Sequence, residues 1–239
     1  MAICPAALWM PVMAHGGPLG QVSILGVVFH VTAGEGDPYN EFVNPANQVS
    51  SHFGILNGQG GTVDGRLEQY VDTKYMSWAQ MAGNSTYLSV ETEGLPTDPL
   101  TPAQIATFGR LMAWINKVHG VPLVITDTVG QRGLITHGDG GVAWGDHIDC
   151  PGPIRAAQRQ SILAAAQSPV SPAPIVNQEE PMFVASVIGE AEDFVVWSNG
   201  TKSGIQDQAT LAALLAVTKQ TAPQQFPATG FIASLPPNA

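Results

Sequence analysis

The sequence predicts an α/β fold in which a central mixed β-sheet is flanked by helices. Residues 23–34 (SILGVVFHVTAG) are rich in β-branched side chains and end at a glycine, as a core strand does where it runs into a loop. Residues 101–120 carry the start and stop signals of a helix. Segments of the two kinds alternate along the chain, which favours helices packed on a sheet.

Two segments near the N-terminus predict strands. Along residues 23–34, the two-residue period of a strand places Val28, His30 and Thr32 on one face. The runs SSHFGIL and RLEQYVD flank a glycine-rich stretch, NGQGG. Residues 50–72 are therefore expected to form two neighbouring antiparallel strands.

The segment YLSVETEG, residues 87–94, is a further strand candidate and has one acidic face. Because side chains alternate along a strand, its members fall into two sets. The two sets are Leu88, Val90 and Thr92 on one side and Ser89, Glu91 and Glu93 on the other.

The clearest helix begins with a capping box. Thr101 and Gln104 have the spacing of that motif, Pro102 suits the first helical position, and Gly120 suits the C-terminal stop. Its apolar side chains recur at helical spacing and predict a buried stripe. The stripe consists of Ile105, Phe108, Leu111, Met112 and Ile115.

Three segments follow this helix. VPLVITD, residues 121–127, is expected to be a returning strand, and residues 153–167 (PIRAAQRQSILAAAQ) a second helix. Between them, residues 133–152 (GLITHGDGGVAWGDHIDCPG) are glycine-rich and are expected to form an irregular loop.

The Pro/Ser-rich stretch SPVSPAP at residues 168–174 is the best domain boundary. We expect a catalytic domain over residues 1–167, a linker over 168–180 and a small module over 181–239. In this module a hairpin with turns at GEAE and SNGT should precede a helix in DQATLAALLAVTKQ. The module could have a binding function or only support the fold.

Charge excludes two classes of partner. The formal net charge is -10, with only 9 Lys and Arg residues in 239. Binding to nucleic acid or to an anionic membrane needs clustered cations, so neither is expected. The sequence also contains no apolar run long enough to insert into a membrane.

The N-terminal stretch does not resemble a signal peptide, because it lacks a basic region and is interrupted by Pro5, Pro11 and Pro18. We therefore expect synthesis in the cytoplasm and export by another route. The two cysteines, Cys4 and Cys150, could pair, but they do not form a disulfide framework.

Histidine and cysteine side chains suggest a zinc site. His30 lies where a strand opens into a loop, and residues 133–152 add His137, His147, Asp149 and Cys150. Imidazole and thiolate are zinc ligands, and a catalytic zinc takes three protein ligands. Spacing alone does not decide which of these side chains bind, and the alternative is that the segment is a solvated polar loop.

Five fragments occur in the order seen in one family: VVFHVTAG, SSHFGIL, SWAQMAGN, YLSVETEG and HGDGGVAWGDHIDCPG. Together they resemble zinc N-acetylmuramoyl-L-alanine amidases of the type-2 amidase and peptidoglycan-recognition-protein superfamily. The resemblance covers roughly residues 20–165 and is strongest to amidase endolysins of actinobacterial phages.

This resemblance implies a Zn²⁺ cofactor held by His30, His137 and Cys150, with His147 as the alternative to His137. It implies hydrolysis of the amide between N-acetylmuramic acid and L-alanine, with peptidoglycan as the substrate. It also implies a bacteriolytic enzyme that is released to the cell wall through a holin.

The resemblance further implies three residues that act on the substrate. Glu91 matches the family's proton shuttle, although it could be an ordinary exposed carboxylate. The family has a lysine or threonine two residues before the third ligand, where it can contact the oxyanion. This chain has Ile148 there, so the role is either unfilled or taken by His147. His52, in an SaHf-like motif, is expected either to act in catalysis or to brace the site.

Two other functions are compatible with parts of this pattern. One is a non-catalytic peptidoglycan-binding protein that keeps the amidase fold, against which the complete set His30, His137 and Cys150 argues. The other is a zinc hydrolase that acts on a different amide, which the order of the motifs does not support.

Overall fold

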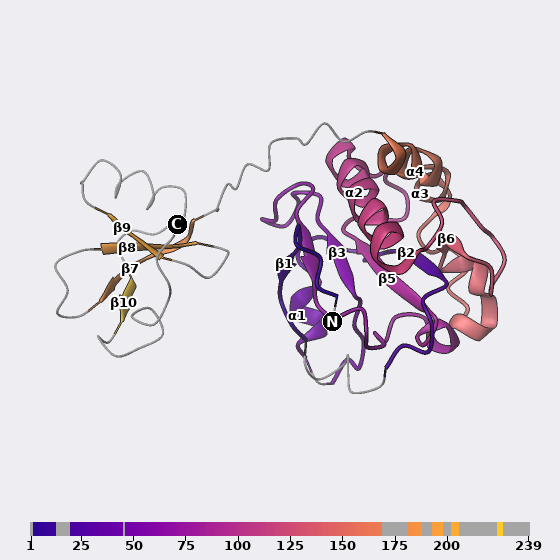
Figure 1. Cartoon of the computed structure of the whole chain (residues 1–239), viewed down its shortest axis with the longest axis horizontal. Helices are drawn as coiled ribbons and strands as arrows, with labels where there is room; N and C mark the ends of the chain where they lie inside the picture. The colour runs from indigo at the N-terminus through magenta and orange to yellow at the C-terminus, as the bar shows by residue number, and fades with distance from the viewer. Residues whose placement is uncertain are drawn as a thin grey trace. The chain divides into compact units, whose positions relative to one another are not determined.

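The structure is a computed structural model, which describes residues 2–12, 20–44 and 46–168 in full and the backbone of four strands nearer the C-terminus. The chain divides into two compact units, residues 1–170 and residues 171–239 (Figure 1). Each unit is described by itself below.

The first unit contains a six-stranded sheet. Its strands are β1 (Leu8–Trp9), β2 (Gly26–Val31), β3 (Phe53–Ile55), β4 (Leu67–Gln69), β5 (Tyr87–Thr92) and β6 (Gly133–Thr136). They lie in the order β1-β4-β3-β5-β2-β6. Only β3 and β4 pair antiparallel, and every other neighbouring pair in this sheet is parallel. The predicted mixed sheet and the predicted antiparallel pair are both confirmed.

Helices connect and cover these strands. They are α1 (Tyr39–Phe42), the 3-10 helix η1 (Met81–Gly83), α2 (Pro102–His119), the 3-10 helix η2 (Gly138–Trp144), α3 (Pro153–Ala157) and α4 (Arg159–Gln167). The predicted capping box is present: the Thr101 side chain accepts from the Gln104 backbone N–H, and the Gln104 side chain accepts from the Thr101 N–H. Gly120 ends α2 in the left-handed conformation, with φ of 67°.

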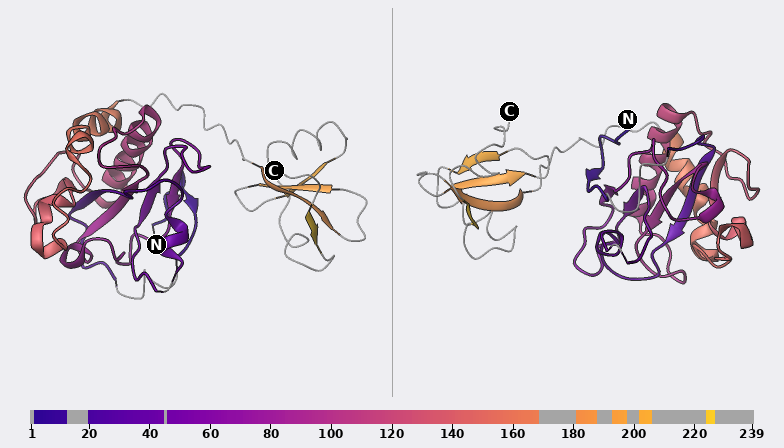
Figure 2. Two further views of the ribbon diagram at one scale, coloured as in Figure 1. Left: turned by 180° about the vertical axis from the view of Figure 1, so that it is seen from behind. Right: turned by 90° about the horizontal axis from the view of Figure 1, so that it is seen from below.

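Helices α2 and α4 pack beside each other on one face of the sheet (Figure 1 and the left view of Figure 2). The core on this face combines one side of three central strands with the apolar stripes of both helices. Its strand members include Val27, Phe29, Phe53, Ile55, Leu88 and Val90, and its helical members include Phe108, Leu111, Met112, Ile115, Ile162 and Leu163. Ile105 packs against this core but is only partly buried.

The opposite face of the sheet carries a smaller apolar cluster and the polar residues of interest. Val28 and Ile135 pack there with Tyr87 and the buried Trp144. His30 shares this face with Val28 because both occupy alternate positions of β2. The helices α2 and α4 therefore stabilise the sheet from one side, and the other side is left for a site.

Three local predictions need correction. Residues 121–127 do not form a strand; Ile125 makes one isolated bridge to Leu134, and the returning strand is β6. Residues 133–152 are not wholly irregular, because Leu134 and Ile135 complete the sheet core as part of β6 and η2 follows. The expected second helix is divided at Gln158 into α3 and α4.

The second unit contains a four-stranded sheet in the order β10-β7-β8-β9. Its strands are β7 (Pro181–Val187), β8 (Asp193–Trp197), β9 (Lys202–Ile205) and β10 (Gln224–Phe226). β8 pairs antiparallel with both β7 and β9, which confirms the expected hairpin pairing, and β10 adds to β7 in parallel. The described sheet therefore has more strands than the single hairpin that was expected. The predicted linker beyond Ser168 and the predicted helix in residues 207–220 lie outside the described residues.

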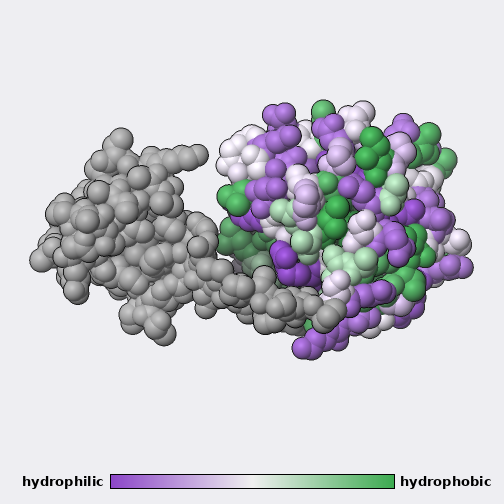
Figure 3. Space-filling model, turned by 90° about the horizontal axis from the view of Figure 1, so that it is seen from above, coloured by the Kyte–Doolittle hydropathy of each residue, from purple (hydrophilic) through white to green (hydrophobic). Residues whose placement is uncertain are grey.

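Among the described residues, no helix is long and apolar enough to cross a membrane. On the face of the first unit seen from above, apolar and polar residues are interspersed (Figure 3).

Candidate metal centre

A cavity of about 530 Å³ opens on the sheet face opposite α2 and α4. Its wall combines the end of β2, helix α1, residues 78–79 and the loop of residues 146–150. His30, Glu91, His137, His147 and Cys150 all line it. Side chains far apart in the sequence therefore meet in one open space that a substrate could enter.

His30, His137 and Cys150 form the one group of potential metal ligands found among the described residues. One ligand atom from each lies within 4.8 Å of the others. His30 is on β2 and His137 directly follows β6, and these two strands are hydrogen-bonded neighbours in parallel. Parallel neighbours end at the same edge of the sheet, so the two imidazole rings meet with centroids 4.4 Å apart.

A folded loop returns Cys150 to this pair. The Gly138 N–H donates to the Cys150 carbonyl oxygen over 2.9 Å, which closes the loop of residues 139–149. A Cβ atom at Gly138 would lie 2.5 Å from the Ile148 carbonyl oxygen, so only glycine permits this close return. Gly138 therefore allows the loop to bring Cys150 close to His30 and His137.

The two histidines are suited to be neutral ligands. Burial, followed by the charge of His137, lowers the pKa of His30 well below its usual value. Burial also lowers the pKa of His137, although its hydrogen bond to the Trp144 carbonyl oxygen opposes this shift. Both imidazoles are thus unprotonated near neutral pH, which metal ligation requires.

Cys150 would remain a neutral thiol without a bound cation, but a cation would stabilise its thiolate form. Burial, followed by the negative charge of Glu91, raises the pKa of the Cys150 thiol to about 12. A bound divalent cation would reverse this balance, because it stabilises the thiolate directly. Two neutral imidazoles and one thiolate are a donor set that zinc prefers, so the residues fit a zinc ion.

The affinity for zinc should therefore depend on pH. Above about pH 8 the Cys150 thiol alone releases a proton on binding, so the apparent Kd should rise about tenfold for each unit by which the pH falls. Below pH 8 Glu91 is also protonated, and the dependence should steepen. Competition with a chromophoric chelator between pH 6.5 and 9 measures both slopes. An affinity that does not change with pH would mean that the Cys150 thiolate is not a ligand.

Glu91 lies beside His30, the first candidate ligand. In the register of β2 and β5 it is paired with His30, and its Oε1 atom is 3.8 Å from His30 Nδ1. Its Oε2 atom is buried without a hydrogen-bond partner. Burial, followed by the negative charge of Glu41, raises the pKa of Glu91 to about 8. A carboxyl group with such a pKa can exchange a proton near neutral pH.

His147 is exposed at the cavity and stacks on His137, with ring centroids 4.7 Å apart. It does not belong to the group of three converging ligand atoms, which favours His137 over His147 as a ligand. Ile148 also lines the cavity and is 69% exposed. An isoleucine at this position offers no hydrogen bond to a substrate, whereas the neighbouring imidazole can.

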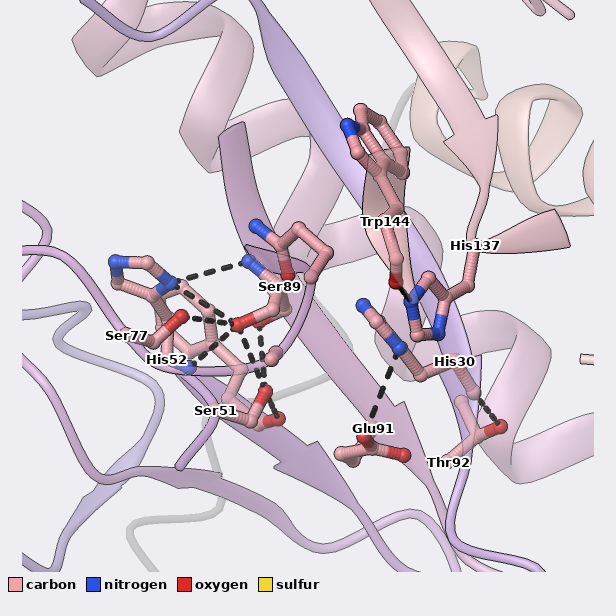
Figure 4. Close-up of polar contacts among 12 residues, drawn as sticks. His30, Ser51, His52, Ser77, Ser89, Glu91, Thr92, His137 and Trp144 are labelled. Atoms are coloured by element: carbon pink, nitrogen blue, oxygen red, sulfur yellow. Dashed lines mark hydrogen bonds and ion pairs between the residues drawn. The ribbon is translucent and has the colours of Figure 1, made fainter. Parts of the chain in front are cut away.

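The structure does not bring His52 to this cavity. It is completely buried in a separate polar group with Ser51, Ser77 and Ser89, while His30 and His137 face each other (Figure 4). The Ser89 N–H donates to His52 Nδ1, so the Nε2–H of the same ring donates to the Tyr75 carbonyl oxygen. Burial lowers the pKa of His52 to about 4. This placement fits the bracing role and not contact with a substrate.

Sequence reasoning missed several residues that shape the site. The Trp144 carbonyl oxygen is hydrogen-bonded to His137 Nε2 over 2.9 Å. A contact made by a backbone atom cannot be predicted from the type of the residue. The buried Arg155 donates to the Thr92 hydroxyl over 2.7 Å, and this hydroxyl donates to the His30 carbonyl oxygen over 2.7 Å. No local sequence pattern marks Arg155, because its acceptors lie about 60 residues away along the chain.

Comparison with known proteins supports this description. The sequence profile of the family described as N-acetylmuramoyl-L-alanine amidase matches residues 20–153. The Staphylococcus aureus hydrolase AmiA, in complex with its ligand, is similar with a TM-score of 0.54 and 16% identity over 69% of this chain and 84% of that chain. The endolysine N-acetylmuramoyl-L-alanine amidase LysCS from Clostridium intestinale URNW gives a TM-score of 0.50 and 17% identity over 67% of this chain and 94% of that chain.

Identities this low show the shared fold alone, and no curated protein sequence matches the chain. The family profile, however, spans more than half of the chain and includes every residue of the ligand group. The chain therefore belongs to the N-acetylmuramoyl-L-alanine amidase family.

Proposed function

We propose that this protein is a zinc-dependent hydrolase that cleaves the amide bond between N-acetylmuramic acid and L-alanine in peptidoglycan, and that it acts as a lytic enzyme on the cell wall. The observation that carries the proposal is the convergence of His30, His137 and Cys150 within 4.8 Å in an open cavity. This convergence lies inside the region that matches the amidase family.

The side chains around the cavity have the roles that amide hydrolysis needs. His30, His137 and Cys150 would hold a zinc ion, which would supply Lewis acidity for hydrolysis of the amide. Glu91, with its pKa near neutrality and its carboxyl group beside His30, accepts the proton of the water and returns it to the departing amine. His147, on the exposed side of His137, donates a hydrogen bond to the carbonyl oxygen as negative charge develops there.

The alternative is a peptidoglycan-binding protein without activity. Such a protein would not need three converging metal ligands or a carboxyl group with a raised pKa beside them. Both features are present here, and they support the hydrolase.

The test is digestion of purified peptidoglycan by the zinc-loaded full chain, followed by mass spectrometry of the products. We expect glycan strands with free lactyl carboxyl groups and peptides with a free N-terminal L-alanine. Removal of zinc with a chelator should stop the reaction, and added zinc should restore it. Binding without these products would support the non-catalytic alternative, and cleavage of a different amide would show another specificity. Cleavage that persists after complete zinc removal would contradict the mechanism.

We also propose that residues 1–167 form the catalytic domain and that residues 181–239 form a separate module. The family match ends at residue 153, and every residue that lines the cavity precedes residue 151. A fragment that ends at Gln167 should therefore fold and hydrolyse soluble muropeptides like the full chain. Circular dichroism and product analysis measure both properties. An unfolded fragment would mean that the second unit completes the core of the first.

Comparing the same fragment with the full chain on intact walls tests the second unit. A loss confined to intact walls would support a wall-binding module, whereas equal rates would leave it without a targeting role. For the route to the wall we propose synthesis in the host cytoplasm and release through a holin, and the sequence resemblance to phage endolysins supports this. Lysis from within cells that lack a holin would contradict it.

A further inference from the structure

We propose that Arg155 is a positioning residue of the metal centre and holds the backbone of His30 and the segment that carries Cys150 in a fixed relation to each other. Its buried guanidinium joins that segment to the end of β5 and, through the Thr92 hydroxyl, to the His30 carbonyl oxygen. The inference rests on the proposed function, because it says how two candidate zinc ligands are kept in place. Arg155 belongs to α3 and does not line the cavity, so it would act through these segments and not on the substrate.

Arg155 is 0% exposed, although no described carboxylate forms an ion pair with it. A fully buried arginine is rare unless its charge is paired, because removing a charge from water is costly. Here hydrogen bonds alone satisfy the guanidinium, and all of its acceptors are uncharged oxygen atoms. The cost of burial is therefore offset only while these acceptors keep their places.

The acceptors of the guanidinium belong to two neighbouring segments. At the end of β5, Nη1 donates to the Thr92 hydroxyl over 2.7 Å and Nη2 donates to the Glu93 carbonyl oxygen over 3.1 Å. In the loop that follows, the Nε–H is shared between the carbonyl oxygens of Leu95 over 3.1 Å and Asp98 over 2.9 Å. Pro96, which lies between these two residues, lines the cavity. One side chain thus fixes the end of a strand together with part of the cavity wall.

The Thr92 hydroxyl extends this connection to the first candidate ligand. It accepts from Arg155 over 2.7 Å and donates its one proton to the His30 carbonyl oxygen over 2.7 Å. The Thr92 carbonyl oxygen also accepts the Thr32 N–H over 3.1 Å. The arginine therefore sets the direction of the hydroxyl proton, and the hydroxyl helps to fasten β2 to β5 at the residue that carries the imidazole.

The segment that carries Cys150 leads directly into Arg155 and packs tightly against the same wall. A Cβ atom at Gly152 would overlap the Pro96 carbonyl oxygen, and a Cβ atom at Gly94 would overlap the guanidinium, so only glycine permits these two approaches. Because the guanidinium holds the carbonyl groups on both sides of Pro96, the segment cannot slide along the wall. Cys150 is thereby kept at its distance from His30.

The first test changes Thr92, because this leaves Arg155 itself in place. Thr92→Val has nearly the same shape but lacks the hydroxyl that joins Arg155 to His30, whereas Thr92→Ser keeps a hydroxyl. In the metal-free full chain, amide hydrogen exchange read by mass spectrometry should be faster in Thr92→Val over residues 29–32 and 138–152. Thr92→Ser should exchange like the wild type. Unchanged exchange in Thr92→Val, or equal acceleration in Thr92→Ser, would overturn the proposal.

The second test titrates the same proteins with Co²⁺, whose absorption spectrum reports thiolate ligation and the geometry of the site. Thr92→Val should bind Co²⁺ about 10–100-fold more weakly, the range typical of removing a group that orients metal ligands, and its visible bands should shift. Thr92→Ser should keep the affinity and the spectrum of the wild type. A wild-type affinity and spectrum in Thr92→Val would contradict the inference. A wild type that binds neither Co²⁺ nor Zn²⁺ would contradict the proposed function, and hydrogen exchange would still decide the inference.

Gln69→Met is the matched control for both tests. Gln69 is completely buried and accepts the Cys4 N–H over 2.7 Å, away from the cavity. The variant should lose stability but keep its Co²⁺ affinity and its exchange over residues 138–152. An equal effect in this control would mean that Thr92→Val acts through general destabilisation, and the proposal would be wrong.

Arg155→Lys separates geometry from charge. Lysine keeps the positive charge, but its single ammonium group cannot replace a planar fork that reaches separate acceptors. Arg155→Lys should therefore lose at least as much Co²⁺ affinity as Thr92→Val. The double variant should lose little more than Arg155→Lys alone, because the two side chains form one connection. Wild-type affinity in Arg155→Lys, or losses that simply add, would refute the positioning role. If Arg155→Lys does not fold, the comparison of Thr92→Val with Thr92→Ser decides.

Discussion

Replacing Cys150 by serine should remove most of the bound zinc and nearly all amidase activity. Serine offers a neutral hydroxyl in place of the only sulfur ligand in the group. The loss of zinc affinity should exceed the roughly 10–100-fold that follows from removing a partner of a ligand, because a ligand itself is lost. Metal analysis of the purified protein and hydrolysis of muropeptides measure the two effects.

Cys4→Ser is the control for this variant. Cys4 is 2% exposed in the core of the first unit, and both cysteines are free in the structure, which excludes the Cys4 to Cys150 pair there. The control should keep its zinc and lose about 1 kcal/mol or more of stability, because a hydroxyl replaces a thiol in an apolar core. Full zinc occupancy in Cys150→Ser would show that His147 or Asp149 completes the site instead.

Replacing His147 by alanine should leave zinc bound and lower kcat by about 10²-fold or more, the effect of losing one donor to a developing oxyanion. The adjacent Ile148 lines the cavity but offers no donor, so no neighbour on this turn of the loop takes over. KM should change less, because the interaction strengthens mainly in the transition state. Steady-state kinetics on a soluble muropeptide, with metal analysis, separate these quantities.

Two further variants sharpen this result. Asp149→Ala changes another exposed residue of the same loop that lines the cavity, and it should keep a kcat close to that of the wild type. Ile148→Lys should partly restore turnover to His147→Ala by returning a donor to the loop. If His147→Ala turns over normally, the proposed role is wrong. If it loses zinc together with activity, His147 is a ligand and the assignment of His137 must change.

The sequence predicted much of the fold because several signals are local. The capping box of Thr101 and Gln104, the stop at Gly120 and the alternation around His30 depend on residues close in sequence, and each is present as expected. The strand prediction for residues 121–127 was wrong. Their β-branched side chains favour a strand, but Val124 and Ile125 remain exposed at the edge. The strand formed instead at β6, where Leu134 and Ile135 could be buried.

The sequence by itself determined the types of the candidate ligands, their order and the resemblance that singled out His30, His137 and Cys150 as candidates, because imidazole and thiolate chemistry belongs to the residues. Only the tertiary structure decided where each ring points and what it touches. It placed His52 in a closed polar group away from the cavity, and it set the Trp144 carbonyl against His137. The physical reason is that these contacts join segments distant in sequence through backbone atoms and buried amides, whose partners exist only after the sheet and its covering loops have packed.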